Sequence, residues 1–469
     1  MKFHLPLLFG ALSLVAGCDP VSSMERGDVD PASAARGERD TSVDTGDTAS
    51  DLDESVREDL ATLERLNAEL LATLGLDADA ITVEFIGHSE PVEVERDASD
   101  GDLSSKTDDF SEARRPEAIR SLRAYNPSSG NEFRLTFSEG VLPLAGELAD
   151  REGLSRGSGD DEVSDPEELE AKLVEEAIAS ADDGRPTDAP PSWSDNVDNR
   201  VRLSKTTAEV PGTTGTTVWP WRAIVRLSNG CTGTMIGPRH VITAGHCIYN
   251  RTSASWMTFN VSPGQAGTGL FPYGSVAFPS SGFNWYFTPE GWRQSSPSGG
   301  TRQYDFGMLV LPQSIGNQTG WMGWWVEEAG ALSKKDHLNR GYPACAATDS
   351  AGNPRTDDPG DPGSSVVCVN QHLYGDVNNC ELGEFSAKDP DGWSRLFKHS
   401  CDASGGHSGS AIYHYEKGSP VISGIHTYST CGQTAAATPC TASDDRPLGA
   451  TRITPEYGDI ISFFRNWKP

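Results

Sequence analysis

Hydrophobic positions follow one pattern in the first part of the chain and another in the second, and the change falls near residue 200. Leucines spaced three and four apart over Leu60–Leu74 predict a helix, and similar spacing over 167–181 predicts another. Between these helices, the run Ile81–Ile86 predicts a short strand. From Val201 onward, short β-rich runs such as His240–Thr243 are separated by clusters of Gly, Pro, Asn and Ser. This second part therefore predicts an all-β domain with many turns.

Charge and composition change at the same place. Residues 1–200 contain 47 acidic and 18 basic side chains, whereas residues 201–469 contain 21 and 20, so the first part carries almost all of the net charge of -30. All 11 Trp lie at or beyond Trp193, and eight of the nine Cys lie at or beyond Cys231. The acidic pI therefore indicates nothing about what the second part binds. We expect no nucleic-acid partner.

These patterns divide the chain into four parts. We expect an export signal at 1–18, an acidic disordered tether at 19–59, a leading segment with some helix and strand at 60–195, and the β-rich domain at 196–469. The tether has almost no large apolar side chains, so burial cannot offset the entropy of ordering it. The segment 60–195 has a second interpretation as a small independent binding module.

The first 18 residues have the form of an export signal. A basic start is followed by an apolar run that is too short to span a bilayer comfortably. The run ends in Leu-Val-Ala-Gly-Cys, which resembles the lipoprotein box of bacteria and makes Cys18 the expected lipidation site and the only link to a membrane. The alternative is an ordinary secretory signal that ends near a cysteine. In both cases we expect export, either to the cell envelope or into the medium after processing.

One serine lies in a loop of small residues, Cys401–Ser410, with the sequence Cys-Asp-Ala-Ser-Gly-Gly-His-Ser-Gly-Ser. Glycines on both sides allow the backbone to approach a substrate carbonyl and to point two N–H groups at an oxygen that becomes negative during acyl transfer. We interpret Ser408 as a nucleophile and the N–H groups of Gly406 and Ser408 as the oxyanion hole. A simple turn is the alternative interpretation of such a loop.

Two upstream segments supply the partners that a nucleophilic serine needs, which are a positioned base and a carboxylate that orients it. Residues 231–247 end in Thr-Ala-Gly-His-Cys, which places His246 beside a cysteine. Farther along, Asp305 directly precedes the apolar run Phe306–Leu311. The order of His246, Asp305 and Ser408 is that of chymotrypsin, and it differs from the orders in subtilisin and in α/β-hydrolases.

From about Asn199 to its C-terminus, the chain resembles the chymotrypsin-like serine proteases, and within them the glutamyl-endopeptidase branch. The resemblance implies two six-stranded antiparallel β-barrels with the active site between them, preceded by a partly disordered pro-region at 60–195. It implies that His246 is the general base, that Asp305 orients it and that Ser408 attacks peptide bonds through an acyl-enzyme. Trypsin itself has an aspartate before the nucleophile to hold its new N-terminus; His407 stands there in this chain, so activation must differ.

The resemblance also implies a disulfide between Cys231 and Cys247 beside the catalytic histidine. The other cysteines are Cys345, Cys368, Cys380, Cys401, Cys431 and Cys440, which allow 15 connectivities. Cys401 with Cys431 and Cys431 with Cys440 are two of the possibilities. No pair has metal-binding Cys-X-X-Cys spacing, and we expect no metal or other cofactor. An alternative calcium site would use Asp357, Asp358 and Asp361.

Substrate specificity depends on residues close to the nucleophile. In the glutamyl branch, a histidine on the strand after the nucleophile helps to bind the substrate carboxylate, and His426, followed by Thr427, occupies that position. A partly charged imidazole would attract Glu or Asp, so we expect cleavage after acidic residues. The branch often has Ser or Thr five residues before the nucleophile, but here Ala403 stands there with Ser404 next to it. Asp402 supports the alternative, cleavage after Arg or Lys.

Three functions from different classes therefore remain. The first is a serine endopeptidase made as a zymogen, whose partners are protein or peptide substrates and its own pro-region. The second is an inactive binding protein with a protease fold. The third places the function in the acidic first part, as an adhesin or an ion-binding arm, with the protease domain as passenger.

Overall fold

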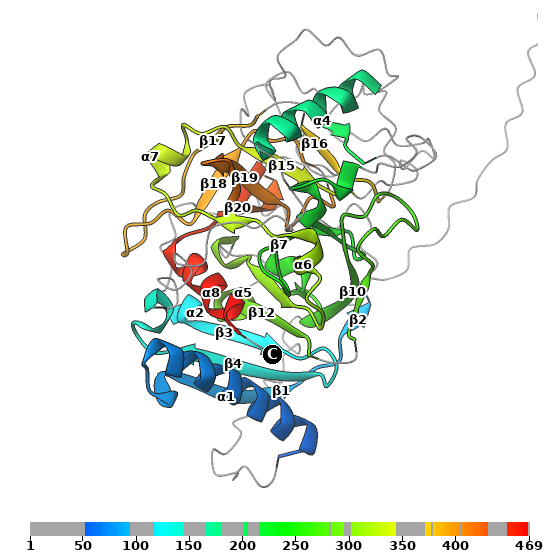
Figure 1. Cartoon of the computed structure of the whole chain (residues 1–469). Coiled ribbons are helices and arrows are strands. Elements are labelled where there is room, and N and C mark those ends of the chain that lie inside the picture. Colours follow the sequence, from blue (N-terminus) through cyan, green and yellow to red (C-terminus); the bar gives the residue numbers. More distant parts are fainter. Residues whose placement is uncertain are drawn as a thin grey trace, which may run out of the picture. The chain divides into compact units, whose positions relative to one another are not determined.

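Short apolar runs fold into strands that build two mainly antiparallel sheets, drawn in Figure 1. The computed structural model describes residues 52–93, 117–144, 165–180, 200–204, 215–280, 283–294, 302–343, 371–376, 379–403, 405–429 and 448–467. These stretches confirm the all-β class and the two-sheet architecture. Within them, every helix is too short or too polar to cross a membrane.

The first sheet carries the histidine and aspartate segments. Its strands are β1 (Ile81–His88), β2 (Val92–Glu93), β3 (Ser121–Tyr125), β4 (Asn131–Phe137), β6 (Ile224–Leu227), β7 (Cys231–Met235), β8 (His240–Thr243), β9 (Tyr249–Asn250), β10 (Ser255–Pro263), β11 (Val276–Phe278), β12 (Trp285–Pro289) and β13 (Gly307–Val310). Their order is β1-β4-β3-β12-β13-β8-β7-β6-β10-β11, and β2 and β9 also pair with β10. All four residues of β8 are buried, the polar His240 and Thr243 as well as Val241 and Ile242.

The second sheet carries the loop Cys401–Ser410 with the candidate nucleophile Ser408, which we call the nucleophile loop. Its strands are β5 (Arg200–Arg202), β14 (Gly323–Trp324), β15 (Leu338–Gly341), β16 (Tyr374–Asp376), β17 (Leu382–Gly383), β18 (Leu396–His399), β19 (Ala411–Glu416), β20 (Ser419–Ser429) and β21 (Leu448–Arg452). They follow the order β17-β18-β21-β20-β19-β15-β16-β5, with β14 parallel to β20. The nucleophile loop thus lies between β18 and β19 in the chain.

The sheets contain more strands than the two six-stranded barrels that we expected. The first has 12 and the second has nine. Four strands of the first sheet, β1 to β4, come from the leading segment. Of these, β1, β4 and β3 join the sheet where β3 pairs with β12 and aligns Tyr125 with Tyr286. An uncovered edge at β12 would present unpaired N–H and C=O groups, and β3 satisfies them.

Helices lie mainly at the ends of the described chain. They are α1 (Glu54–Leu74), α2 (Glu117–Arg120), α4 (Pro166–Ser180), α5 (Glu290–Gln294), α6 (Gly316–Thr319), α7 (Ala329–Leu332) and α8 (Pro455–Arg465), with 3-10 turns η1 (Ala78–Ala80), η3 (Gly215–Thr217), η4 (Trp221–Ala223), η5 (Gly245–Cys247) and η6 (Arg302–Tyr304). The helix predicted over Leu60–Leu74 is confirmed as part of α1, but α1 begins at Glu54, so residues 54–59 are helical and the expectation of a disordered tether up to residue 59 is wrong there. The helix predicted over 167–181 corresponds to α4, and the strand predicted over Ile81–Ile86 lies within β1. Asp53 caps the start of α1 by accepting a hydrogen bond from the N–H of Ser55.

The leading segment shares its core with the β-rich domain. Tyr125 of β3 stacks on Trp256 of β10 with ring centroids 4.7 Å apart. Beside this pair, the buried Arg123 guanidinium binds the carboxylates of Glu290 at 2.7 Å and Glu132 at 3.2 Å. Backbone pairing, aromatic packing and buried charge therefore all join β3 to the first sheet.

Candidate active site

Strand pairing brings His246 and Asp305 together. The register of β8 with β13 places Thr243 opposite Gly307, so the residues that follow β8 and precede β13 meet at one edge. The Nδ1 atom of His246 lies 2.7 Å from Oδ2 of Asp305, and the backbone N–H of His246 donates to Oδ1 at 2.8 Å. Both side chains are almost completely buried. The carboxylate therefore fixes the ring and holds a proton on Nδ1, which makes Nε2 the basic nitrogen.

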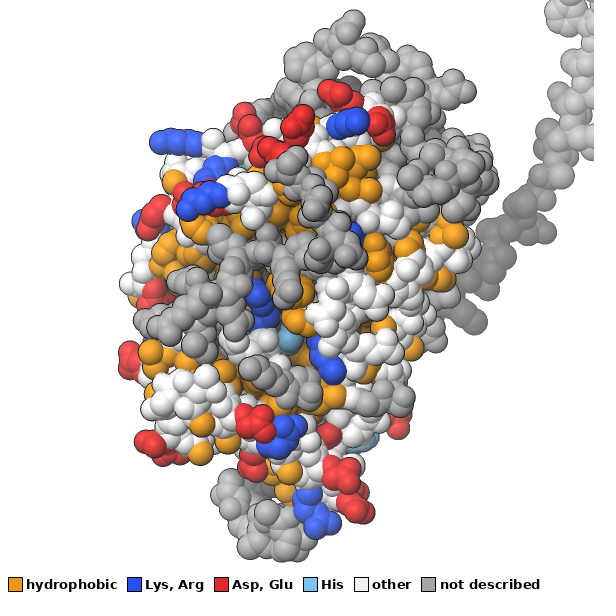
Figure 2. Space-filling view, in the orientation of Figure 1, with side chains coloured by type: hydrophobic (Ala, Val, Ile, Leu, Met, Phe, Trp, Pro, Cys, Tyr) orange, Lys and Arg blue, Asp and Glu red, His pale blue; other side chains and the backbone are white. Residues whose placement is uncertain are grey.

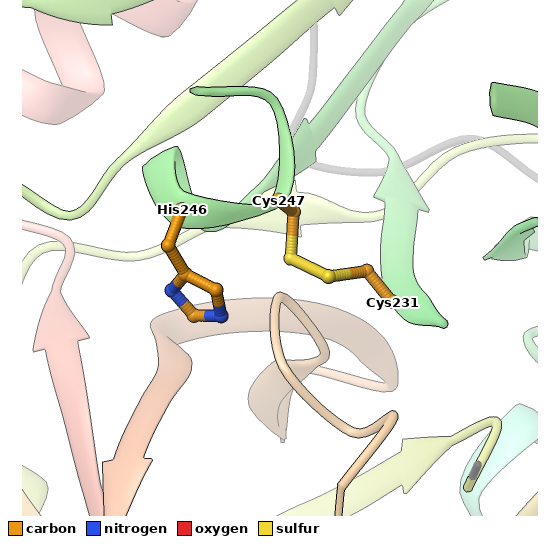
Figure 3. Close-up of side chains that lie close together, drawn as sticks. All are labelled: Cys231, His246 and Cys247. Carbon is orange, nitrogen blue, oxygen red and sulfur yellow. A yellow bond between two sulfur atoms is a disulfide. The ribbon is translucent and has the colours of Figure 1, made fainter. Parts of the chain in front are cut away.

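A disulfide closes the segment that holds His246. Cys231 and Cys247 are joined across a sequence separation of 16 residues, and Figure 3 shows the bond beside the histidine ring. One ring nitrogen and the two sulfur atoms lie within 4.8 Å of one another, a spacing that is also typical of metal ligands. Because both sulfur atoms are in the disulfide, they are not available as thiolates for a metal.

The serine loop packs directly against the same segment. The N–H of Thr232 donates to the carbonyl of Ser408 at 2.8 Å, and the Thr232 hydroxyl donates to the carbonyl of Gly406 at 2.7 Å. Gly409 has a φ of 86°, and a Cβ at this position would lie 2.1 Å from Oγ1 of Thr243. Glycine is therefore required there, both for the left-handed conformation and for the close approach of the loop to β7 and β8.

His407 is buried between two partners that define its protonation. Its Nδ1 lies 2.9 Å from Oδ1 of Asn339, an acceptor, and its Nε2 lies 3.2 Å from Nη1 of Arg200, a donor. Burial first, and then the charge of Arg200, hold the pKa of His407 well below its usual value. A neutral imidazole with its proton on Nδ1 satisfies both partners, in the position where trypsin has a charged aspartate.

His426 is also buried and neutral. Its Nδ1 lies 3.0 Å from Nε2 of His399. Burial, and then the neighbouring charges of His246 and Arg200, lower the pKa of His426 to about 3. The expectation of a partly charged imidazole is therefore wrong for the unliganded protein at neutral pH, because desolvation outweighs the nearby carboxylate of Asp305.

The structure describes three other residues at or next to the predicted pocket positions, Thr427, Asp402 and Ala403. Thr427 follows His426 on β20, and its hydroxyl is 3.4 Å from that of Thr451. The Asp402 N–H donates to Oδ2 of Asp376 at 2.9 Å, and its side chain is buried. Ala403 is buried too, whereas Ser404 lies outside the described residues. The chain thus has alanine where a pocket hydroxyl was expected.

Comparisons with known proteins agree with this geometry. The family model described as Trypsin matches residues 212–321. The glutamyl endopeptidase of Bacillus licheniformis is 41% identical over 157 residues, which are 32% of this chain and 43% of that protein. The chain therefore resembles the chymotrypsin-like serine proteases, and within them a glutamyl endopeptidase. The aligned part of the chain spans less than half the length of this relative.

Two further matches cover more of the domain. The extracellular metalloprotease of Bacillus subtilis is 26% identical over 285 residues, which are 59% of this chain and 71% of that protein. A solved structure titled as Glu endopeptidase in complex with MPD is 21% identical and covers 57% of this chain and 97% of its own, with a TM-score of 0.37.

Arg200 is a charged residue near the candidate site that the sequence analysis did not identify. It lies on β5, which pairs with β16 and places Arg200 opposite Asp376. Its guanidinium is buried beside His407, and its charge acts on both His407 and His426. The sequence signal was weak, since β5 is three residues long and an arginine in a short polar run is typical of a surface.

The second described disulfide joins Cys380 to Cys401. This pairing excludes the suggested bond between Cys401 and Cys431, because Cys401 is already bonded. It ties the start of the nucleophile loop to the segment before β17. The predicted roles of Cys18, Cys345, Cys368, Cys431 and Cys440, and the suggested calcium ligands Asp357, Asp358 and Asp361, concern positions outside the described residues.

One more group of described side chains has metal-like spacing. It consists of Asp389, Asp391 and Glu456. The guanidinium of Arg395 binds all three carboxylates and so already supplies their positive partner.

Proposed function

We propose that the chain is an exported serine endopeptidase that is made as a zymogen and cleaves after acidic residues. The observation that carries this proposal is the buried pair of His246 and Asp305 at the edge against which the Ser408 loop is hydrogen-bonded. A binding protein has no need for a histidine held in one tautomer beside a serine, so this arrangement favours catalysis over the inactive alternative.

In the proposed mechanism, Oγ of Ser408 attacks the substrate carbonyl carbon while Nε2 of His246 takes the hydroxyl proton. Asp305 stabilises the resulting imidazolium, and the N–H groups of Gly406 and Ser408 bind the oxyanion. The tetrahedral intermediate then expels the amine, which receives the proton from His246, and leaves an acyl group on Ser408. A water molecule deprotonated by His246 releases the acid and restores the serine.

We propose that Arg200 and His426 together favour an acidic substrate side chain. The neutral His426 contributes a hydrogen bond, and the buried charge of Arg200 supplies the attraction that we had first assigned to the histidine. A bound carboxylate would also raise the pKa of His426. Asp402 supports the competing preference for Arg or Lys.

Export and activation complete the proposal. We propose that 1–18 direct export, that Cys18 carries a lipid, and that cleavage before the domain at 196–469 separates it from the pro-region at 60–195. With His407 and Arg200 at the site of trypsin's activation ion pair, a new N-terminal amine would meet a cationic side chain there, so activation must act elsewhere.

A serine-directed fluorophosphonate tests the function. We expect covalent labelling of processed protein at Ser408, identified by peptide mapping, and loss of labelling in Ser408→Ala. A matched control, Ser410→Ala, keeps a serine at the nucleophile position. A folded, processed sample that never labels would refute the enzyme and support the inactive binding protein.

A further inference from the structure

Helix α4 inserts one carboxylate into the second sheet. Its buried positions are Glu170, Val174 and Ala177, spaced as one face of a helix. Glu170 points inward from this face and is 2% exposed. The outer face carries exposed acidic side chains, which gather over α4 at the top of Figure 2. Glu170 is thus the buried acidic side chain among the described residues of this strongly acidic helix.

Four donors surround the Glu170 carboxylate. Nε of Arg340 lies 3.1 Å and Nε1 of Trp221 lies 2.8 Å from Oε1. The hydroxyl of Tyr413 donates to Oε1, and that of Tyr415 donates to Oε2, each at 2.6 Å. One cation and three neutral donors form a socket that matches a carboxylate and would leave an amide poorly satisfied.

Arg340 of this socket lies between Asn339 and Gly341 in the sequence, and both of these residues are close to the nucleophile loop. Next to Arg340 on β15, the Asn339 side chain binds Nδ1 of His407 and donates to Oγ of Ser410 at 2.7 Å. On the other side, a Cβ on Gly341 would lie 2.8 Å from the ring of His407. A shift of Arg340 would therefore move Asn339 and Gly341, which contact His407 and Ser410 on the two sides of Ser408.

We propose that the socket of Trp221, Arg340, Tyr413 and Tyr415 is a docking site for an acidic helix, and that α4 stays bound there after the chain is cut. The docked helix neutralises Arg340 and so holds the nucleophile loop in place. This second role rests on the proposed protease function. Glu170 is a positioning residue, because it acts through Arg340 and β15. Part of the predicted pro-region is in this way retained by the processed protein.

The first test measures docking alone, in the intact chain. Hydrogen exchange of the α4 amides is compared among wild type, Glu170→Gln and the control Glu175→Gln, which makes the same charge change on the exposed face. Because Arg340 loses its buried counter-charge, we expect about 100-fold faster exchange in E170Q. E175Q should match wild type. Unchanged protection of α4 in E170Q would overturn the proposal.

A milder variant covers the case in which E170Q does not fold. Tyr415→Phe keeps the ring and removes one donor to the carboxylate, so we expect about 10-fold faster exchange of α4. The ring of Tyr415 is only partly buried, which favours folding of this variant. Wild-type exchange in Tyr415→Phe would contradict the socket.

The second test measures retention and its effect. Recognition sequences for a site-specific protease are placed in 145–164 and in 181–199, and native mass spectrometry follows α4 after both cuts. We expect α4 to remain bound in wild type and to leave E170Q, with slower labelling of Ser408 by the fluorophosphonate. A synthetic peptide of residues 164–181 should restore the rate, whereas the same peptide with Glu170→Gln should not.

The outcomes separate the two proposals. Release of wild-type α4 on cutting refutes docking, and release without any change in the labelling rate refutes the effect on the loop. If no sample labels, whatever its processing, the protease function fails, while hydrogen exchange and retention still report on the socket.

Discussion

The two sheets build the site in different ways. The first sheet contributes a buried hydrogen-bonded pair, His246 with Asp305, on a segment closed by a disulfide. The second sheet contributes histidines that burial keeps neutral, and the buried arginines Arg200 and Arg340 supply positive charge on the strands next to the nucleophile loop. In the proposed mechanism, the first sheet therefore supplies the base, and the second sheet determines the charge around the nucleophile and the substrate.

The leading segment also attaches differently to the two sheets. On the first sheet, β3 adds a strand and packs aromatic side chains into the shared core. On the second sheet, α4 depends on one buried carboxylate in a socket. A ladder of backbone hydrogen bonds is insensitive to one substitution, whereas a single buried charge is not. The second attachment is therefore the one suited to regulation.

Lowering the pH should have the largest effect on stability, and it should destabilise the second sheet before the first. Five histidines in or beside it have a pKa below the usual value because of burial: His337, His399, His407, His414 and His426. In the unfolded chain these histidines bind protons below about pH 6.5, whereas in the folded protein they bind protons only near their lower pKa values, about 3 for His426. Their contribution to the free energy of unfolding is therefore fully present above about pH 6.5 and is lost as pH falls from there toward those values. Each group costs about 1.4 kcal/mol per pH unit in this window.

Urea unfolding between pH 7 and pH 4.5 measures this loss. We expect uptake of several protons on unfolding near pH 5. Uptake of fewer than one proton would show that the five rings are not buried and neutral together.

Asp305→Asn should have the next largest effect and act on the first sheet alone. The amide holds His246 in the wrong tautomer, so we expect kcat to fall by about 10⁴-fold with a small change in KM. Steady-state hydrolysis of a peptide substrate measures it, with the wild type at the same pH as reference. A loss of less than tenfold would contradict the assigned role of Asp305.

Arg123→Met tests the attachment of the leading segment to the first sheet. It leaves Glu290 and Glu132 buried without their shared cation, so the free energy of unfolding should fall by about 4 kcal/mol. Arg120→Met is the matched control, since its side chain is 49% exposed, its partner Glu139 is 87% exposed, and its loss should cost about 1 kcal/mol or less. Equal losses in the two variants would mean that the buried network does not join the segment to the sheet.

Arg200→Gln tests the charge of the second sheet and should have the smallest effect. For a peptide with Glu before the scissile bond, kcat/KM should fall by about 100-fold, because the substrate carboxylate loses its buried cation. The matched peptide with Gln at that position should change little. An equal loss on both peptides would assign Arg200 to the nucleophile loop rather than to specificity.

Much of the site follows from local sequence. Thr-Ala-Gly-His-Cys, Asp305 before its apolar run, and the glycine-rich loop around Ser408 are contiguous patterns whose chemistry depends on immediate neighbours. The long leucine-spaced helix α1 was predictable for the same reason.

What the sequence did not reveal depends on contacts between distant residues. Glu170 is one acid among many in its helix, and it is distinguished by donors that lie far away in the chain, among them Arg340, 170 positions later. The pKa of His426 depends on burial rather than on its neighbours in the chain. The pairing of β3 with β12 joins segments that a composition boundary separates. Such features arise from tertiary structure and leave no periodic signal.

The central claim is a protease that cleaves after acidic residues, and cleavage of three matched peptides tests it most directly. The peptides differ only in having Glu, Gln or Lys before the scissile bond, and kcat/KM is measured for processed wild type and Ser408→Ala. The account predicts that Glu is preferred over Gln and Lys, and that Ser408→Ala cleaves none of them. Faster cleavage after Lys, or equal cleavage by wild type and Ser408→Ala, would contradict it.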